Sequence, residues 1–316
     1  MELVIINSVT CLVINIFHYK KNEPWDIARK WHSTQWQADV LMPLKNSMTS
    51  KYIKEISSSL YQIIEVCGEY IVREGWNVIL SILQRAIELL NDNSLAANEV
   101  YSYAEDILKC IEDICDKSLH KIDVSNIEDL LEILCHFIYM KNSVEMGLSS
   151  VDSILKVVLF ISQQQSTGKL LNAPEKSSKL WTSIFAKLTE AGKSEHIEIR
   201  NGIYKTLSAI IETCCDKLPL STWSNSLLTS ISDLLKFATA NYFDYSQGMI
   251  AMRSNMTCTP KFVVTEEKKP KAMKFDPEII ARNAEEQKVK RKLQEKSITI
   301  LYNTLMNMLL KLHSLK

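Results

Sequence analysis

The chain has 316 residues, of which 46% are hydrophobic, and it contains only seven glycines and seven prolines. This length exceeds what one hydrophobic core usually organises, and the scarcity of glycine and proline argues against a sheet protein with many turns. Its 37 basic and 37 acidic residues give a net charge of zero, which argues against binding of nucleic acid through an overall field. We therefore expect a mostly helical chain that forms two domains or one elongated array.

Apolar residues recur three and four positions apart through most of the chain, a spacing that predicts amphipathic helices. In chain order, we expect helices at about 2–19, 25–46, 51–72, 75–90, 97–119, 126–140, 144–162, 174–190, 196–215, 221–240 and 277–314. Most connections between them are short, so successive helices should lie antiparallel to each other.

The first predicted helix, 2–19, is rich in apolar residues but is interrupted by Asn7, Ser8, Thr10 and Asn15. It is too short and too polar to span a bilayer core of about 30 Å. Glu2 stands where a signal peptide would carry basic residues. We expect this segment to be an amphipathic helix at the start of the array.

The start of the helix at 126–140 carries a capping signal. Ser125 and Glu128 have the spacing of a capping box, in which each side chain satisfies a backbone amide of the first turn. This pattern predicts that the helix begins at Asn126.

The segment 180–223 is the clearest indication of the fold. Two amphipathic patterns flank a short polar break at 191–194, and their apolar residues are Leu180, Trp181, Ile184, Phe185 and Leu188, then Ile199, Ile203, Leu207, Ile210 and Ile211. Two helices with a tight connection form an α-hairpin, and stacked hairpins form a solenoid. The residues around Val144 weakly resemble those around Ile199, 55 residues later (199 − 144). We expect an all-α, irregular HEAT/armadillo-like solenoid.

The helical pattern weakens after residue 240. Residues 241–276 include Gly248, Pro260 and Pro270 with little periodicity, which predicts a long loop that is either functional or disordered. The final helix is charged in its first half and amphipathic in its second half, so the second half should dock on the array. The predicted organisation is a HEAT-like array at 1–240, a long loop or insertion at 241–276 and a docking helix at 277–316.

A cluster of lysines within this predicted loop is the strongest local charge signal. Lys268, Lys269, Lys271 and Lys274 lie between Phe262 and Phe275. Such a cluster could contact anionic lipid or a partner, at about 1 kcal/mol per cation near a membrane surface. The alternative is a solvated linker, because acidic residues are interleaved with the basic ones. Both interpretations stay open from the sequence.

The six tryptophans fall into two groups. Trp76, Trp181 and Trp223 lie on apolar helical stripes, which predicts structural roles in the core. The others, Trp25, Trp31 and Trp36, crowd into one short segment and do not share a single helix face. Large aromatic residues are common anchors of protein interfaces, so these three are candidate partner contacts.

Catalytic signals are absent from the sequence. There is no G-x-S-x-G motif, no P-loop and no glycine-rich dinucleotide turn, and no histidine has a second histidine or a cysteine three or four residues away. The eight cysteines form no C-x-x-C pair and mostly lie in apolar stripes, as expected for thiols packed in a reduced intracellular protein. We expect no catalytic residue, no metal and no cofactor, and hence no enzymatic activity.

Several blocks of residues, in a fixed order, resemble a known family. They are Cys67-Gly68-Glu69, then Glu74–Leu80, Asn142–Leu155, Leu180–Leu188, Ile199-Arg200-Asn201 and Trp223. Together they span about 70 to 235 and are similar to the helical region of the monensin-sensitivity scaffolds, which partner Dopey. That family is related to the large BIG-type Arf guanine-nucleotide exchange factors.

The chain departs from the family pattern in two respects. Glu198-Ile199-Arg200 replaces the usual Pro-x-Val-Arg turn, and residues 90–130 diverge, as in a fast-evolving fungal member. Arginines at the position of Arg200 commonly pair with an acidic residue of a neighbouring unit in HEAT-like stacks, so we expect a structural role for Arg200.

The resemblance implies a segment of a longer scaffold in endosome-to-Golgi transport, cytoplasmic and peripheral on those membranes. A Dopey-like protein is the implied partner, a small Arf-type GTPase is a second candidate, and no nucleic acid is expected. The alternative is a regulatory helical segment of an Arf exchange factor. Peripheral membrane contact is compatible with either function.

Overall fold

The computed structural model describes residues 2–20, 34–91, 95–140, 143–166, 174–214, 218, 222–257 and 277–314. Within these residues the secondary structure is helical and contains no strand, which confirms the predicted all-α fold. The α-helices are α1 (Glu2–Lys20), α3 (Thr34–Asn46), α4 (Ile53–Cys67), α5 (Arg73–Leu90), α6 (Ala97–Asp113), α7 (Val124–Tyr139), α8 (Val144–Ser166), α9 (Pro174–Ala191), α10 (Ile197–Cys214), α12 (Leu228–Thr257) and α13 (Pro277–Ser314).

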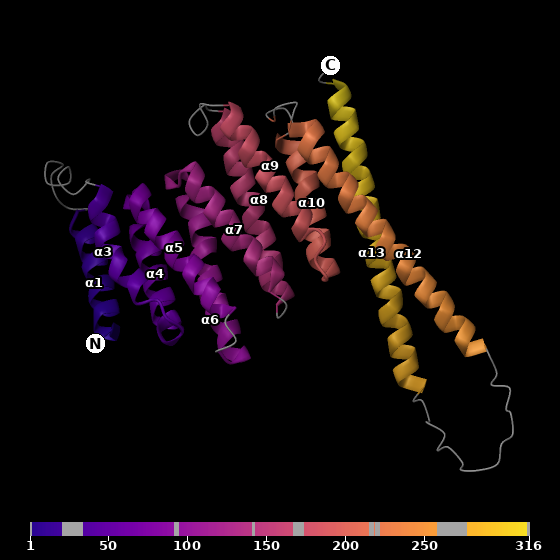
Figure 1. Cartoon of the computed structure of the whole chain (residues 1–316), viewed down its shortest axis with the longest axis horizontal. Coiled ribbons are helices and arrows are strands. Elements are labelled where there is room, and N and C mark those ends of the chain that lie inside the picture. The colour runs from indigo at the N-terminus through magenta and orange to yellow at the C-terminus, as the bar shows by residue number, and fades with distance from the viewer. Residues whose placement is uncertain are drawn as a thin grey trace, which may run out of the picture.

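The helices alternate strictly between two layers as the chain proceeds. In the first layer each helix contacts the next in the order α1, α4, α6, α8, α10, α13. In the second layer the order of contact is α3, α5, α7, α9, α12. Figure 1 shows the resulting row of helices, with the N-terminus at one end and α12 and α13 at the other. Helices of one layer run in one direction and those of the other layer run oppositely, which is the arrangement of an α-solenoid.

The connection from a first-layer helix to the next second-layer helix has the same local structure at two places in the array. A short 3₁₀ helix, Gly68–Tyr70, precedes α5, and a second one, Leu119–Lys121, precedes α7. Each is followed by a buried isoleucine in an extended conformation, Ile71 or Ile122. The Ile71 amide donates to Gly68 O (3.4 Å) and the Ile122 amide to Leu119 O (3.1 Å). The structural repeat here is 51 residues (122 − 71), close to the 55-residue similarity seen in the sequence.

The core of the array is built from the predicted apolar stripes. The two stripes of the 180–223 segment lie on α9 and α10, and all ten of their residues are almost fully buried. Trp181 and Phe185 stack within α9, with ring centroids 5.9 Å apart. Burial of one such aliphatic or aromatic side chain contributes roughly 1.5–3 kcal/mol, so the stripes supply most of the drive for stacking.

Several boundaries differ from the sequence prediction, and two of them have a clear physical reason. The cap of α7 is Asp123 rather than Ser125, because the Asp123 carboxylate accepts a hydrogen bond from the Asn126 amide (3.0 Å). The predicted loop from residue 241 is wrong up to Thr257, because α12 continues to that residue. A single glycine such as Gly248 costs only about 1 kcal/mol in a helix. Pro260 and Pro270 both lie beyond Thr257, so neither interrupts α12. Residues 258–276 lie outside the described part of the chain.

The last helix, α13, packs against α10 and α12. On one side of α13, Ser297 Oγ lies 2.5 Å from Asn201 Oδ1, and Lys311 Nζ donates to the carbonyls of Ile211 (3.1 Å) and Glu212 (2.8 Å). These contacts run in the same order along α10 and α13, so the two helices are parallel. Lys311 also places a positive charge at the C-terminal end of α10, where the helix dipole is negative.

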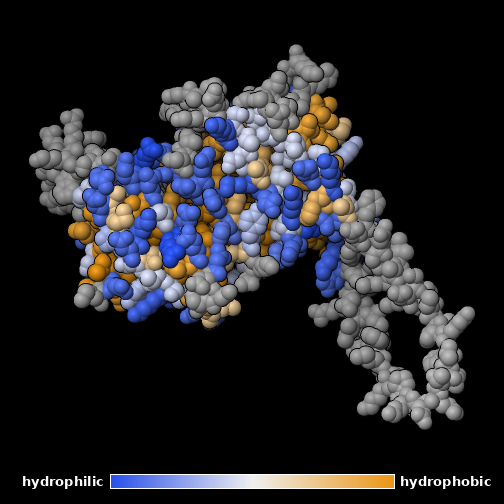
Figure 2. Space-filling view, viewed as in Figure 1, coloured by the Kyte–Doolittle hydropathy of each residue, from blue (hydrophilic) through white to orange (hydrophobic). Residues whose placement is uncertain are grey.

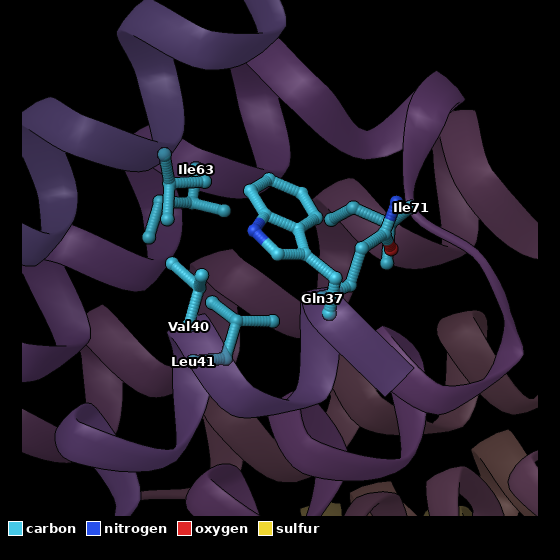
Figure 3. A pocket seen from close by; sticks show the side chains of 7 residues that line it. Gln37, Val40, Leu41, Ile63 and Ile71 are labelled. Carbon is cyan, nitrogen blue, oxygen red and sulfur yellow. The ribbon is translucent and has the colours of Figure 1, made fainter. Parts of the chain in front are cut away.

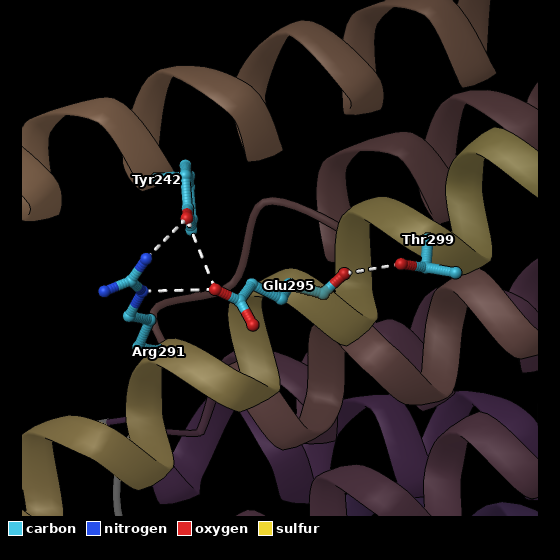
Figure 4. Close-up of polar contacts among 4 residues, drawn as sticks. All are labelled: Tyr242, Arg291, Glu295 and Thr299. Carbon is cyan, nitrogen blue, oxygen red and sulfur yellow. Dashed lines mark hydrogen bonds and ion pairs between the residues drawn. The ribbon is translucent and has the colours of Figure 1, made fainter.

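A second set of contacts joins α13 to α12 (Figure 4). Arg291 Nε lies 3.1 Å from Glu295 Oε1, and both side chains reach Tyr242 of α12. The Thr299 hydroxyl donates to the backbone carbonyl of Glu295 (2.9 Å). These groups are solvent-exposed, so they orient the two helices and contribute little to the free energy of folding.

Among the described helices, none is both long enough and apolar enough to cross a membrane.

Candidate protein-interaction site

A small apolar pocket opens at the N-terminal end of the array (Figure 3). Its walls come from α1, α3, α4 and the turn before α5, and the lining residues are Val13, Trp36, Gln37, Val40, Leu41, Ile63 and Ile71. Trp36 is half-buried and packs against the core. The pocket brings a predicted partner contact, Trp36, together with aliphatic groups from three helices.

Gln37 fixes the shape of this pocket. Its side-chain amide donates to the carbonyl of Tyr70 (3.0 Å), and its side-chain oxygen accepts from the amide of Val72 (2.8 Å). The glutamine therefore pairs with the extended backbone between the 3₁₀ turn and α5, much as a neighbouring strand would. Gly75 permits this close approach, because a Cβ there would lie 2.7 Å from Gln37 Oε1 and 2.8 Å from Ile71 Cγ2.

The side chains that line this pocket favour contact with apolar groups of another protein. Its lining includes no ionisable side chain, and its only polar side chain, Gln37, is already hydrogen-bonded at both ends. The hollow has a volume of only about 10 Å³, so this surface can offer the Trp36 ring and its apolar rim as a contact but has no room for a partner side chain.

A wider and more polar groove lies where α7, α9 and the turn before α10 meet. It is lined by Ile138, Tyr139, Glu190, Lys193, Ser194, Glu195 and His196. Lys193 Nζ lies 3.8 Å from Glu190 Oε2. Burial raises the pKa of the Tyr139 hydroxyl to about 12, so this group is a neutral hydrogen-bond donor at physiological pH.

Arg200 stabilises the turn between α9 and α10, which forms part of the wall of this groove. Its guanidinium donates to the carbonyls of Ser194 (2.7 Å) and Glu195 (3.1 Å). The Tyr204 hydroxyl donates to the carbonyl of Gly192 (3.0 Å). Burial lowers the pKa of Arg200 from its ordinary value. The expected ion pair with an acidic residue of a neighbouring unit is therefore replaced by bonds to backbone carbonyls, since the turn between α9 and α10 leaves those carbonyls free of helical partners.

The other predicted site residues fall into two classes. Trp76, Trp181 and Trp223 are fully buried in the core. The remaining candidates lie outside the described residues: Trp25, Trp31, Lys268, Lys269, Lys271 and Lys274. Within the part that the structure describes, no cluster of three histidine, cysteine, aspartate or glutamate side chains could hold a metal ion.

Sequence reasoning missed Gln37 and the Tyr139 groove. Gln37 looks like a solvated residue because glutamine side chains are mostly exposed, and its neighbours Trp36 and Ala38 do not indicate a bond to a distant backbone segment. The one available signal was Gly75, since a glycine in the first turn of a helix can indicate that another group approaches closely.

Comparison with known proteins gives two matches. Residues 28–100, which include α3, α4, α5 and most of the pocket beside Trp36, match a family model described as Sec7-like HDS, Mon2/Sec7/BIG1-like. The chain is also 23% identical over 194 residues to the Protein MON2 homolog of Schizosaccharomyces pombe. That match covers 56% of this chain but only 12% of the relative. No solved structure matches the chain. The family resemblance predicted from the sequence is confirmed by these matches.

Proposed function

Because the chain is a relative of the Mon2/Sec7/BIG1-like proteins, we propose that it is a scaffold segment that binds another large trafficking protein. The observation that carries this proposal is the uninterrupted two-layer stack of helices. The stacked repeats of a solenoid create a long exposed surface, and proteins of this architecture act mainly by presenting that surface to partners. The scaffold acts in this proposal without catalysis of its own.

The pocket beside Trp36 is the proposed point of contact. It combines the half-buried Trp36 ring, an apolar rim and a frame set by Gln37, and a partner would pack its apolar groups on this surface, because the hollow itself holds only about 10 Å³. The family model also covers most of these residues, so the site lies within the part of the chain that the model matches. Trp25 and Trp31 precede Trp36 in sequence and stay proposed partner contacts.

The proposed partner is a Dopey-like protein, and the proposed location is the cytoplasmic face of Golgi and endosome membranes, in endosome-to-Golgi transport. Both follow from the family resemblance. Affinity capture from cytosol with this chain as bait, read by mass spectrometry, tests the partner. Strong recovery of a Dopey-like protein is expected. Recovery of Arf-type GTPases alone, or of nothing, would contradict it.

The role of the pocket needs a matched pair of baits. Trp36→Ala should lose the partner, because it removes the aromatic contact at the pocket. Tyr101→Ala removes an aromatic side chain that is exposed on α6, away from the pocket, and should retain the partner. Circular dichroism of both variants confirms that each is folded. Equal recovery by the two baits would place the contact elsewhere.

A regulatory segment of an Arf guanine-nucleotide exchange factor is the second candidate. The description of the matching family model, which includes Sec7 and BIG1, favours it. In that case the parent polypeptide would exchange nucleotide on an Arf-type GTPase, and the rate would change when this segment is deleted. An exchange assay with fluorescent nucleotide, using the full-length polypeptide, separates the two candidates. Absence of exchange would leave the scaffold function.

Peripheral membrane contact through Lys268, Lys269, Lys271 and Lys274 is compatible with either function. Sedimentation with anionic vesicles at low and high salt tests it, since attraction between exposed charges weakens as salt increases. Reversal of the four charges to glutamate should abolish binding. Binding that survives the reversal would exclude this cluster as the membrane contact.

A further inference from the structure

The groove between α7, α9 and the turn before α10 is much larger than the hollow beside Trp36. Its volume is about 270 Å³, against about 10 Å³ for that hollow. One buried water needs roughly 10–15 Å³, and sites that enclose a drug-sized molecule have roughly 300–1,000 Å³. The groove therefore has room for a side chain of another polypeptide but not for a large cofactor.

The groove lies in the middle of the array, between helices that have neighbours on both sides. In the second layer, α7 packs between α5 and α9, and α9 packs between α7 and α12. Its shape is therefore set entirely by interior helices. Hydrophilic side chains make up much of the described surface in the view of Figure 2. A partner that binds at mid-array must accordingly bond to polar groups as well as contact apolar ones.

Two polar groups of the groove are free to bind a ligand. Among the described residues, neither the Tyr139 hydroxyl nor the Glu195 carboxylate has a hydrogen-bond or ion-pair partner. The Tyr139 side chain is 46% exposed. Burial raises the pKa of its hydroxyl to about 12, and the negative charge of Glu190 contributes to the rise, which places that carboxylate near the ring. An aromatic ring and two carboxylates therefore line the same hollow.

The helix ends at this edge of the array favour a positive ligand. α7 and α9 both end here, so their negative C-terminal ends lie at the groove (Figure 1). The helices α8 and α10 begin at the same edge, but each has a glutamate in its first turn, Glu145 or Glu198, which offsets the positive end. Lys193 lies beside Glu190, and Arg200 is bonded to two backbone carbonyls. The groups left to bind a ligand are therefore mainly acceptors.

The preceding junction in the same layer lacks these free groups. There Asn91, the residue after α5, places its Nδ2 atom 2.6 Å from Nε2 of His136 on α7, and this bond joins the two helices. Met140 is the corresponding residue after α7, and its apolar side chain cannot form an equivalent bond to α9. The junction between α7 and α9 therefore stays open and its polar groups stay unpaired.

We propose that this groove binds a lysine or arginine side chain from an extended segment of a partner protein. The cation would lie between the Glu195 carboxylate and the Tyr139 ring, with its aliphatic part along the wall at Ile138. A lysine ammonium has three donors to share among these oxygens, and an aromatic face attracts a cation within about 6 Å of its centre. This site is separate from the contact proposed beside Trp36 and does not depend on it.

NMR of the chain with isotope-labelled isoleucine methyl groups tests the proposal and detects weak binding. Ile138 lines this groove, whereas Ile63 and Ile71 line the hollow beside Trp36. The probe is the peptide Gly-Ser-Lys-Leu-Ser-Gly, blocked at both ends. It should shift the Ile138 resonance in a saturable manner and leave those of Ile63 and Ile71 in place. The same peptide with acetyl-lysine keeps its length but loses the charge, and should leave Ile138 unshifted.

Matched variants assign the binding groups. Glu195→Gln should weaken binding of the lysine peptide about two- to fivefold, as for loss of an exposed ion pair. Tyr139→Ala should weaken it about tenfold, because it removes the aromatic contact. Glu128→Gln removes a carboxylate at the other end of α7, and Tyr101→Ala removes an exposed ring on α6. Both controls should bind like the unaltered chain, and thermal melts establish that all four variants are folded.

Three outcomes would overturn the proposal. The first is an Ile138 resonance that does not move up to the solubility limit of the lysine peptide. The second is equal binding of the lysine and acetyl-lysine peptides, which would remove the role of charge. The third is a stronger response to a peptide with glutamate in place of lysine, which would assign the groove to an acidic segment. Equal losses in the Glu195→Gln and Glu128→Gln chains would likewise exclude this carboxylate as the contact.

Discussion

At the scale of single residues, the Gln37 side chain connects α3 to the backbone that leads into α5. It bonds to the carbonyl of Tyr70, the last residue of the 3₁₀ helix, and to the amide of Val72, which directly precedes α5. A buried backbone group left without a partner costs about 1–3 kcal/mol. The shape of the Trp36 pocket therefore depends on a side chain that does not itself need to touch a partner.

Replacement of Gln37 by leucine should lower the free energy of unfolding by about 2–3 kcal/mol, because the Tyr70 carbonyl and the Val72 amide both lose their partner. Gln35→Leu is the control, since Gln35 is exposed and bonds only to Asp39 (3.1 Å). Urea denaturation followed by circular dichroism measures both changes. Similar losses in the two variants would mean that the Gln37 bonds contribute no special stability.

The buried cysteines give a second prediction at this scale. Burial raises the pKa of the Cys67, Cys110 and Cys115 thiols to about 12. It raises the pKa of Cys135 to about 11. The reactive species is the thiolate, so these four should resist a maleimide at pH 8 while the exposed Cys11 is modified. Peptide-resolved mass spectrometry measures the labelling, and rapid modification of the four buried thiols in the folded chain would contradict the prediction.

The same shifts set the direction of the pH dependence. The folded-state pKa of these thiols lies above their ordinary value of about 9, so the unfolded chain loses the protons first as the pH rises. Their contribution to stability is complete below about pH 9 and is lost between about pH 9 and pH 12. A melting temperature that does not fall over this range would argue against burial of the thiols.

At the scale of helices, α13 is the most informative element because adjacent residues have opposite environments. Leu301 is fully buried, whereas Tyr302 is 54% exposed. Leu301→Ala should lower the free energy of unfolding by about 2–4 kcal/mol, from lost burial and the cavity that it leaves. Tyr302→Ala should change it by less than about 0.5 kcal/mol. Chemical denaturation of the two variants measures the difference, and a reversed order would mean that α13 is rotated on the array.

Helix type was predictable from the sequence wherever a stripe is buried, and less so elsewhere. The α9–α10 hairpin followed from ten apolar residues at helical spacing, and all ten are in the core. The continuation of α12 to Thr257 was missed because a helix without an apolar stripe has no periodicity to detect. The start of α7 was misplaced by two residues because Ser125 and Asp123 are both good caps, and only the structure shows which one accepts the amide.

The candidate site was predicted only in part. Trp36 was identified as a candidate because it lies in an aromatic-rich segment, and the structure places it at an apolar pocket. Its surroundings could not be predicted, since they come from residues up to 58 positions apart (Val13 to Ile71) that only stacking brings together. The role of Arg200 in its own turn likewise depends on carbonyls whose direction the sequence does not reveal.

At the scale of the whole molecule, each unit of the solenoid contacts only its neighbours, so stability should vary along the array. α1 and α13 pack within their layer on one side, whereas α6 and α8 pack on both. Native-state hydrogen exchange at low protein concentration, read by mass spectrometry, should therefore show faster exchange in the two end helices. Uniform protection from α1 to α13 would mean that the array unfolds as a single cooperative unit.

The opposed directions of the two layers have an electrostatic consequence. Each helix has a positive N-terminal end and a negative C-terminal end, and neighbours across the layers point oppositely, so their dipoles largely cancel. The sequence adds equal numbers of acidic and basic residues. The array therefore has neither a net charge nor a strong overall dipole with which to attract a partner from a distance. Encounters should proceed by unsteered diffusion, at about 10⁵–10⁶ M⁻¹s⁻¹, and should respond little to salt.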